Sequence, residues 1–143
     1  AGVPGVADPG AAVVAECHRC GIRVVPLVGP SSILLALMAS GLNGQSFAFN
    51  GYLPVKPPER SRAIRFFERR AQAEGQSQLF IEAPYRNVKL FEELLRTLAP
   101  TTRLTLAVDV TAPGERIITR TVAEWQRLPL PEMNKRPAIF IIG

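Results

Sequence analysis

Two loops rich in proline and glycine are the part of this chain best suited to hold a small molecule. They span residues 1–10 (AGVPGVADPG) and 26–32 (PLVGPSS), and each leads into a segment with helical character. Glycine lets a main chain approach a ligand closely, and the first N–H groups of a helix have no partner within that helix. One expected strand separates the loops, so both are expected at the ligand-binding edge of an α/β sheet. Either loop alone is explained by ordinary turn formation, whereas two in succession favour a site.

Side chains for strong acid–base or metal chemistry are scarce. The motifs of P-loops, dinucleotide folds and hydrolase nucleophile elbows are absent, and the single histidine, His18, lies away from both loops. Zinc needs about four ligands, so we expect no metal site. Cys17 and Cys20 fall at the C-terminal end of a helix, which does not activate thiols, and we interpret them as reduced and packed along that helix. The remaining main chain, Ser, Pro and carboxylate groups suit a cofactor that carries its own activated group.

Composition indicates a globular protein with a real core. The chain has 143 residues, of which 47% are hydrophobic, and 17 basic against 12 acidic residues give a net charge of +5. This charge permits RNA binding without requiring it. The longest apolar run, 33–39, is far short of the roughly 20 residues that span a bilayer, and we predict a soluble, cytoplasmic protein. The sequence opens as if inside a structured loop, so we expect a piece of a longer protein.

Hydrophobic periodicity predicts the α/β class. The boundary near 41–45 divides a first part too small to fold alone from a second of about a hundred residues. In the first part, Asp8 is the expected N-cap of the first helix, and the last helix is apolar on nearly every side and expected to be buried. The expected elements are helix 9–20, strand 22–27, helix 31–40, strand 47–53, helix 59–73, strand 79–82, helix 88–98, a hairpin of strands 103–110 and 116–121, helix 122–127 and strand 138–142.

Four segments resemble successive motifs of one family: AGVPGVADPG at 1–10, RVVPLVGPSS at 23–32, FNGYLPVK at 49–56 and IEAPYR at 81–86. The family is that of the tetrapyrrole methylases, the corrin/porphyrin type of methyltransferase that depends on S-adenosylmethionine (SAM). The chain most resembles the bacterial branch that methylates ribose 2'-hydroxyls of small-subunit ribosomal RNA. The resemblance covers essentially the whole chain, in order.

The resemblance implies a two-domain fold with SAM in the cleft between the domains and no metal. Residues 1–42 would be the end of the N-terminal cofactor-binding domain, and 43–143 would be a C-terminal mixed-sheet α/β domain. The positions that match the family's cofactor contacts are Gly2, Val3, Pro4, Gly29, Pro30, Ser31, Ser32, Ile81, Glu82, Ala83, Ala107, Pro137 and Ala138. The family's upstream glycine-rich loop has no counterpart, so we expect this chain by itself to bind SAM weakly or not at all. A homodimer is implied by the family alone.

The acceptor side of the site is less defined. Tyr85 and Arg86, just beyond a strand end, are the predicted substrate contacts. Glu82 and Asp109 are the available carboxylates, but each is more typical of a structural group than of a base, so no catalytic residue is assigned. The segment VDVTAP at 108–113 departs from the Arg-Glu-Leu-Thr-Lys-like run of the ribosomal RNA branch, which leaves the RNA acceptor open. A tetrapyrrole or other small-molecule acceptor, or a non-catalytic RNA-binding or interaction module, remain alternatives.

An arginine-rich segment follows the FNGYLPVK motif. Arg62, Arg65 and Arg69 share one helical face, with Lys56, Arg60 and Arg70 nearby. Such a row of cations can bind phosphates of RNA. Interleaving with Glu59, Glu68 and Glu74 is equally typical of a solvated helix face, which is the interpretation we favour.

Overall fold

The computed structural model describes residues 2–143, and a five-stranded mixed sheet forms its centre. The strands are β1 (Phe47–Tyr52), β2 (Ser77–Ile81), β3 (Arg103–Val108), β4 (Arg116–Thr121) and β5 (Ala138–Ile142), in the order β1-β2-β5-β3-β4. β1 and β2 run parallel, and the β2–β5, β5–β3 and β3–β4 pairs are antiparallel. The predicted α/β class, mixed sheet and β3–β4 hairpin are thus confirmed.

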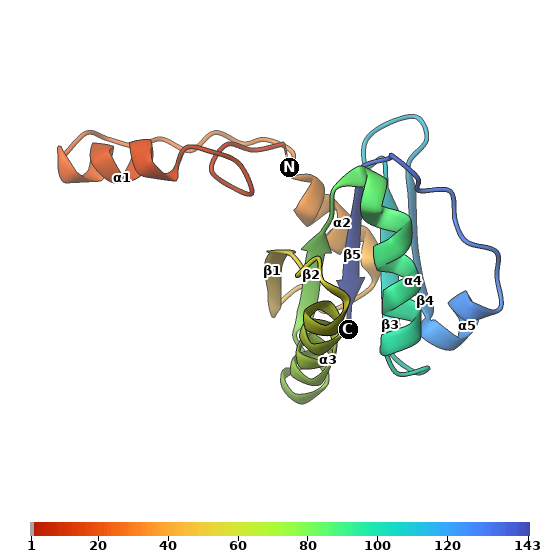
Figure 1. Ribbon diagram of the computed structural model, residues 1–143. Coiled ribbons are helices and arrows are strands. Elements are labelled where there is room, and N and C mark those ends of the chain that lie inside the picture. The colour runs from red at the N-terminus through yellow and green to blue at the C-terminus, as the bar shows by residue number, and fades with distance from the viewer. Residues whose placement is uncertain (1) are drawn as a thin grey trace.

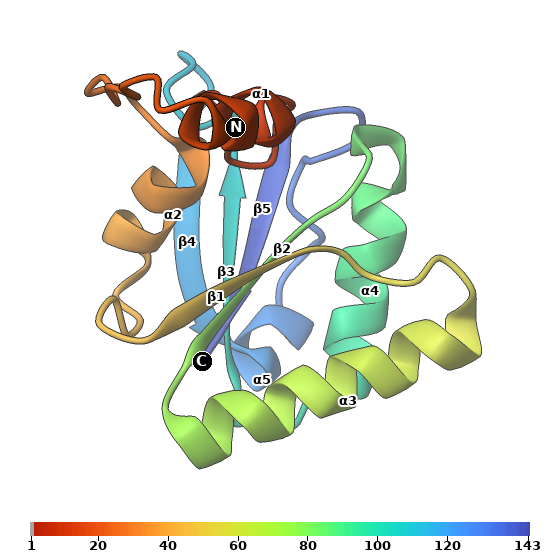
Figure 2. The ribbon, with the colours of Figure 1, turned by 90° about the vertical axis from the view of Figure 1, so that its left-hand side faces the viewer.

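Helices cover both faces of this sheet (Figure 2). On one face lie α3 (Pro57–Glu74), α4 (Asn87–Thr97) and α5 (Val122–Gln126), and on the other lies α2 (Ser32–Ser40). A hydrophobic core lies on each face of the sheet, and successive strand residues point alternately into one core or the other. Phe80 and Phe140 face α4, whereas Leu79 and Ile141 face α2. A short 3-10 turn, η1 (Pro84–Arg86), leads from β2 into α4.

Local sequence explains where the main helices begin and end. The Ser31 side chain accepts a hydrogen bond from the Leu34 N–H and begins α2, and Gly41 ends it with φ 72°. The burial of α2 is one-sided: Ile33 and Leu37 are buried against the sheet, whereas Met38 is 77% exposed. The expectation of an all-round buried helix is therefore wrong for the described chain.

Residues 2–30 form an arm that projects from the sheet and contains α1 (Ala11–Arg19) (Figure 1). No residue of this arm is buried. The predicted helix 9–20 is present but begins later, with Gly10 at its N-cap position and no side-chain cap, so Asp8 does not cap it. The predicted strand 22–27 is absent because a strand needs a neighbour for its N–H and C=O groups, and none pairs with this segment in residues 2–143.

No helix within residues 2–143 is both long and apolar enough to cross a bilayer. The division of the chain at 42/43 stays a prediction.

Candidate functional site

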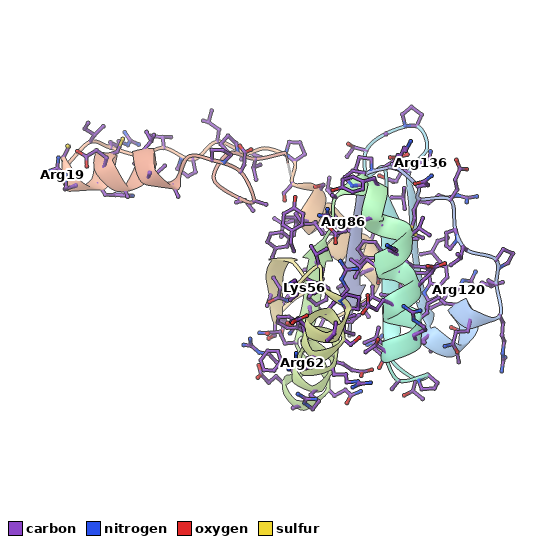
Figure 3. The ribbon with its side chains drawn as sticks, in the orientation of Figure 1. Arg19, Lys56, Arg62, Arg86, Arg120 and Arg136 are labelled. Atoms are coloured by element: carbon purple, nitrogen blue, oxygen red, sulfur yellow. The ribbon has the colours of Figure 1, made fainter. Side chains whose placement is uncertain are left out.

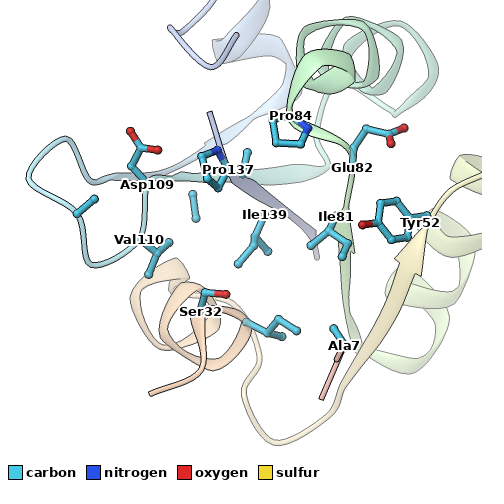
Figure 4. Close-up of a pocket in the computed structure, with 14 residues that line it drawn as sticks. Ala7, Ser32, Tyr52, Ile81, Glu82, Pro84, Asp109, Val110, Pro137 and Ile139 are labelled. Carbon is cyan, nitrogen blue, oxygen red and sulfur yellow. The ribbon is translucent and has the colours of Figure 1, made fainter. Parts of the chain in front are cut away.

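A cavity of about 350 Å³ opens at the edge of the sheet where β2 and β3 end and β5 begins (Figure 4). Ile81, Ala107 and Ile139, from three adjacent strands, form an apolar wall, and Ser32 at the start of α2 faces them. The lining residues are Ala7, Ser32, Ile33, Tyr52, Ile81, Glu82, Pro84, Ala107, Asp109, Val110, Ala112, Pro137, Ala138 and Ile139.

The structure brings part of the predicted cofactor-binding set together at this cavity. The predicted residues that line it are Ser32, Ile81, Glu82, Ala107, Pro137 and Ala138. Gly2 and Pro30 line an adjoining hollow of about 230 Å³, which shares Ser32 with the cavity. The predicted residues that line neither space are Val3, Pro4, Gly29, Ser31 and Ala83. Ser31 caps α2 instead.

The two glycine-proline loops lie against each other. A Cβ atom built on Gly2 would stand 2.5 Å from the Pro30 carbonyl oxygen, and one on Gly29 would stand 3.5 Å from Val3 Cγ1. Gly2 has φ +101°, so it needs glycine both for its backbone conformation and for this close approach. The side-by-side placement expected of the two loops is therefore observed.

Left-handed backbones gather at the cavity. Among residues 2–143, the non-glycine residues with positive φ are Ala7, Asp109, Thr111 and Lys135. Ala7 (φ 53°) and Asp109 (φ 51°) line the cavity, and Thr111 (φ 72°) lines the adjoining hollow. Such conformations cost roughly 1–3 kcal/mol each and concentrate at functional sites.

Neither cavity carboxylate is free to act as a base. One Glu82 oxygen, Oε1, accepts bonds from the Ala83 N–H (2.7 Å) and from Arg86 Nε (3.1 Å) and Nη2 (2.9 Å). The other oxygen, Oε2, lies 3.1 Å from Arg60 Nη2. Asp109 Oδ2 lies 2.7 Å from Arg136 Nε. The structural interpretation of both carboxylates agrees with these contacts.

Glu82 belongs to a buried charge cluster that extends into the helix layer. Arg60 lies between Glu82 and Glu93, with Nη1 3.5 Å from Glu93 Oε2, and its Nε donates to the Pro54 carbonyl oxygen at 2.8 Å. Arg60 is thus not part of a solvated arginine row. Glu68, placed in the same solvated face by its spacing, is also buried and accepts bonds from the Ala99 N–H and the Thr102 hydroxyl.

The predicted substrate contacts lie beside the cavity rather than in it. The Arg86 guanidinium stands 4.8 Å from the centre of the Tyr85 ring, and it also donates to the Tyr85 hydroxyl. The hydrogen-bonded Glu82 carboxylate, with smaller contributions from Tyr85 and Tyr52, raises the pKa of Arg86 above its ordinary value. Arg86 therefore keeps its charge at any working pH.

Some lining residues were missed although the sequence carried a signal for them. Tyr52 stands within the FNGYLPVK motif and Ala7 within the first loop, but neither was selected. Tyr52 pairs with Ile81 across the β1–β2 ladder, a register that a single sequence does not reveal. Ile33 lies in the predicted helix 31–40 and Ile139 in the predicted strand 138–142, and their apolar side chains alone do not indicate a binding role.

The C-H-R-C segment takes no part in this site. Cys17, on α1, and Cys20, the residue that follows α1, are free thiols. Cys17 is half-buried and Cys20 is exposed, so neither is packed into a core in the described chain. Within residues 2–143 no group of three or more His, Cys, Asp or Glu side chains could hold a metal ion.

Curated relatives share the sequence over nearly all of this chain. It is 34% identical over 133 residues to "Ribosomal RNA small subunit methyltransferase I" of Vibrio cholerae serotype O1, covering 93% of this chain and 42% of that protein. The protein of the same name from Escherichia coli O157:H7 is 32% identical over 142 residues, covering 99% and 48%. The chain thus spans about half the length of these relatives. No protein-family model matches it.

Solved structures share the fold. A uroporphyrin-III-C-methyltransferase from Thermus thermophilus superposes with a TM-score of 0.56 at 25% identity, covering 99% of this chain and 60% of that one. The methyltransferase CobJ superposes with a TM-score of 0.60 at 20% identity, covering 99% and 61%. The sequence relatives and the shared fold agree with the resemblance of the motifs described above to the tetrapyrrole methylase family.

Proposed function

We propose that this chain forms part of a SAM-dependent methyltransferase that acts on ribosomal RNA, at a ribose 2'-hydroxyl of the small subunit. The observation that carries the proposal is the cavity at the sheet edge, where residues of α2, β2, β3 and β5 that match the family's cofactor contacts converge. The names of the ribosomal RNA methyltransferase relatives support the acceptor class. Action on RNA in turn supports a cytoplasmic location, and the family supports a homodimer.

The residues present fit part of such a cofactor. The cavity volume lies at the lower end of the range for small-molecule sites, and its small side chains, such as Ala107 and Ala138, leave room beside the strand ends. An apolar wall of this kind suits the flat ring of such a cofactor, and the main-chain groups of the glycine-proline loops suit its polar ends. When bound, SAM supplies an activated methyl group on a sulfonium.

The chain's own contribution to such a transfer is positioning. An in-line displacement depends strongly on holding the two reacting groups in line, and an error of about 1 Å costs on the order of a hundredfold in rate. Glu82 and Asp109 are both paired with arginines, so they shape the cavity wall and do not accept the acceptor's proton.

The contact between the two loops offers a direct test. In the natural gene product that carries this chain, Gly2→Ala places a methyl group against the Pro30 carbonyl and forces the loops apart. S-adenosylhomocysteine affinity, measured by calorimetric titration, is expected to fall roughly ten- to a hundredfold because the binding geometry shifts.

Gly5→Ala is the matched control. Gly5 also has a left-handed backbone (φ +79°), but a Cβ atom there meets nothing within 4 Å. Gly5→Ala therefore also places an alanine in a left-handed backbone but does not move the loops, and its affinity for S-adenosylhomocysteine should stay near that of the wild type. Equal losses in both variants would remove the loop contact from the argument.

A methyl-transfer assay with two acceptors separates action on ribosomal RNA from action on a tetrapyrrole. Purified small ribosomal subunits and uroporphyrinogen are offered in turn with labelled SAM, and methyl transfer to the ribosomal RNA alone is the expected result. Transfer to the tetrapyrrole instead would overturn the acceptor. A gene product that binds no SAM at all would point to a non-catalytic RNA-binding or interaction module.

A further inference from the structure

The charge cluster around Glu82 is placed so that only its cationic end reaches solvent. The side chains of Arg60, Glu82 and Glu93 are exposed by 4%, 1% and 8%, whereas that of Arg86 is exposed by 27%. The four formal charges sum to zero, with the two carboxylates and Arg60 turned toward each other inside. The surface beside the cavity therefore presents a guanidinium and no carboxylate of this cluster.

Stability alone does not account for such an arrangement. Desolvating buried ions costs about as much as their attraction returns, and a well-packed apolar cluster is often equally stable. What the ionic cluster adds is a fixed direction for the outermost guanidinium. Glu82 holds Arg86 through both Nε and Nη2, and Arg60 in turn fixes Glu82.

Arg86 has donors to spare. A guanidinium has five N–H groups, and three are used by the bonds of Nε and Nη2 to Glu82 and of Nη1 to the Tyr85 hydroxyl. The others remain for a ligand. A planar guanidinium held in one orientation suits the paired oxygens of a phosphate better than a flexible ammonium does.

Two exposed tyrosines lie near the Glu82–Arg86 pair, Tyr85 in contact with Arg86 and Tyr52 at the neighbouring strand end. Tyr85 is 66% exposed and Tyr52 is 63% exposed. Tyr52 also lines the cavity, where Figure 4 shows it with Glu82. Tyr52 pairs with Ile81 across the β1–β2 ladder. Ile81 precedes Glu82, to which Arg86 is hydrogen-bonded. Exposed aromatic rings beside a cation are the arrangement by which proteins bind single-stranded nucleic acid, with the ring against a base and the cation on the backbone.

From this geometry we propose that Arg86, Tyr85 and Tyr52 form the binding site for one nucleotide of a single-stranded RNA acceptor. The phosphate pairs with Arg86 and the base stacks on a tyrosine, which places the ribose beside the cavity. Glu82 and Arg60 are positioning residues that act through Arg86. The proposal deepens the proposed function and rests on it.

The test measures RNA binding without SAM, using the natural gene product and a short fluorescein-labelled single-stranded RNA in anisotropy titrations. Arg86→Ala is expected to weaken binding roughly ten- to a hundredfold, because a charge-assisted contact to phosphate is lost. The slope of log affinity against log salt should fall by about 0.7, the value for one phosphate of a single strand. Tyr85→Ala should cost roughly tenfold, while Tyr85→Phe keeps the ring and most of the affinity.

Arg62→Ala is the matched control for charge. Arg62 lies on α3, away from Arg86 in Figure 3, and its side chain is 74% exposed. Its guanidinium pairs with Glu59 at 4.0 Å and donates to the Pro58 carbonyl oxygen at 3.3 Å. The Arg62→Ala substitution removes the same charge as Arg86→Ala. It should change the affinity for RNA less than twofold, which is about the effect of one screened surface charge. Equal losses in Arg62→Ala and Arg86→Ala would mean non-specific attraction and would overturn the site.

The role of Glu82 in orienting Arg86 is tested by introducing Glu82→Gln into the wild type and into the Arg86→Ala variant. The substitution should weaken RNA binding in the wild type and have no further effect once Arg86 is alanine, since it acts only through that residue. A merely structural role predicts the same loss factor in both backgrounds.

The remaining outcomes separate this site from the methyl transfer itself. A wild-type protein that binds SAM but no RNA overturns the nucleotide site and leaves the cofactor proposal standing. Wild-type RNA binding that depends on Arg86, in a protein without methyl transfer, supports the site while the proposed function fails. Arg86-dependent binding of uroporphyrin in place of RNA overturns it in favour of a carboxylate ligand.

Discussion

The arm of residues 2–30 and the sheet body of residues 47–143 use similar residue types with opposite results. In the body, apolar side chains such as Phe80 and Phe140 are fully buried between strands and helices. In the arm, Leu27 and Val28 are almost fully exposed, and α1 buries nothing. Apolar composition alone therefore does not make a core, because burial needs a second layer to pack against.

The same contrast holds for charge pairs. Arg60 and Glu82 are buried and bridge α3 to the end of β2, whereas Arg19 and Glu16 pair within one exposed helix. A buried pair fixes two elements relative to one another, while an exposed pair within a helix contributes little. The buried contacts of the body hold its strand ends in fixed positions. The apolar wall of the cavity is therefore formed by residues at these strand ends.

Removal of one arginine from each region should give the largest difference in stability between the two regions. Arg60→Ala leaves Glu82 and Glu93 buried beside each other without that cation, and the free energy of unfolding should fall by about 3–5 kcal/mol. Arg19→Ala removes an exposed partner and should leave the unfolding midpoint in urea unchanged. Similar midpoints for the two variants would contradict the assignment of a buried cluster.

Truncation of one leucine in each region should give a somewhat smaller difference in the free energy of unfolding. Leu90→Ala empties part of the core under α4 and should cost roughly 2–5 kcal/mol, since the packed side chains cannot close the gap. Leu27→Ala, on a side chain that is 86% exposed, should stay within about 0.5 kcal/mol. Thermal unfolding of the 143-residue chain gives both values. A large loss at Leu27 would show that the arm is packed in solution.

Acid titration gives the smallest expected effect. In the capping box of α5, the Thr121 main-chain N–H and hydroxyl lower the pKa of Glu124 from its ordinary value of 4.5. Because the folded pKa is depressed, this contribution to stability is complete above pH 4.5 and is lost as pH falls through the folded value. Thermal midpoints of wild type and Glu124→Gln should therefore converge from about pH 6 down to about pH 3.

The corresponding arm carboxylate serves as the control. Arg19 lowers the pKa of Glu16, followed by a smaller contribution from Cys20, so its charge also changes in this range. Because α1 packs against no other element in residues 2–143, Glu16→Gln should leave the acid dependence of the body's unfolding as in the wild type. A shift as large as that of Glu124→Gln would contradict the separation of arm and body.

The ends of the helices could be predicted from the sequence where they depend only on neighbouring residues. Ser31 and Gly41 bound α2, and Gly75 ends α3, because caps and left-handed turns depend on a few adjacent residues. The strand at 22–27 failed because its hydrogen-bond partners must come from elsewhere. In the site, the two loops were predicted to meet, but the pairing of Glu82 with Arg60, 22 residues away in sequence, was not.

Patterns in the amino-acid sequence were enough to predict the α/β class, most elements of the body, the adjacency of the two glycine-proline loops and the family resemblance. Each of these rests on spacing, caps and motifs that are local in the chain. Three features became visible only in the folded chain. Arg60 is an interior cation, Tyr52 lines the cavity beside Ile81, and the apolar arm projects away from the sheet. These depend on contacts between distant segments, which exist only once the strands have taken their register and the helices have packed on them.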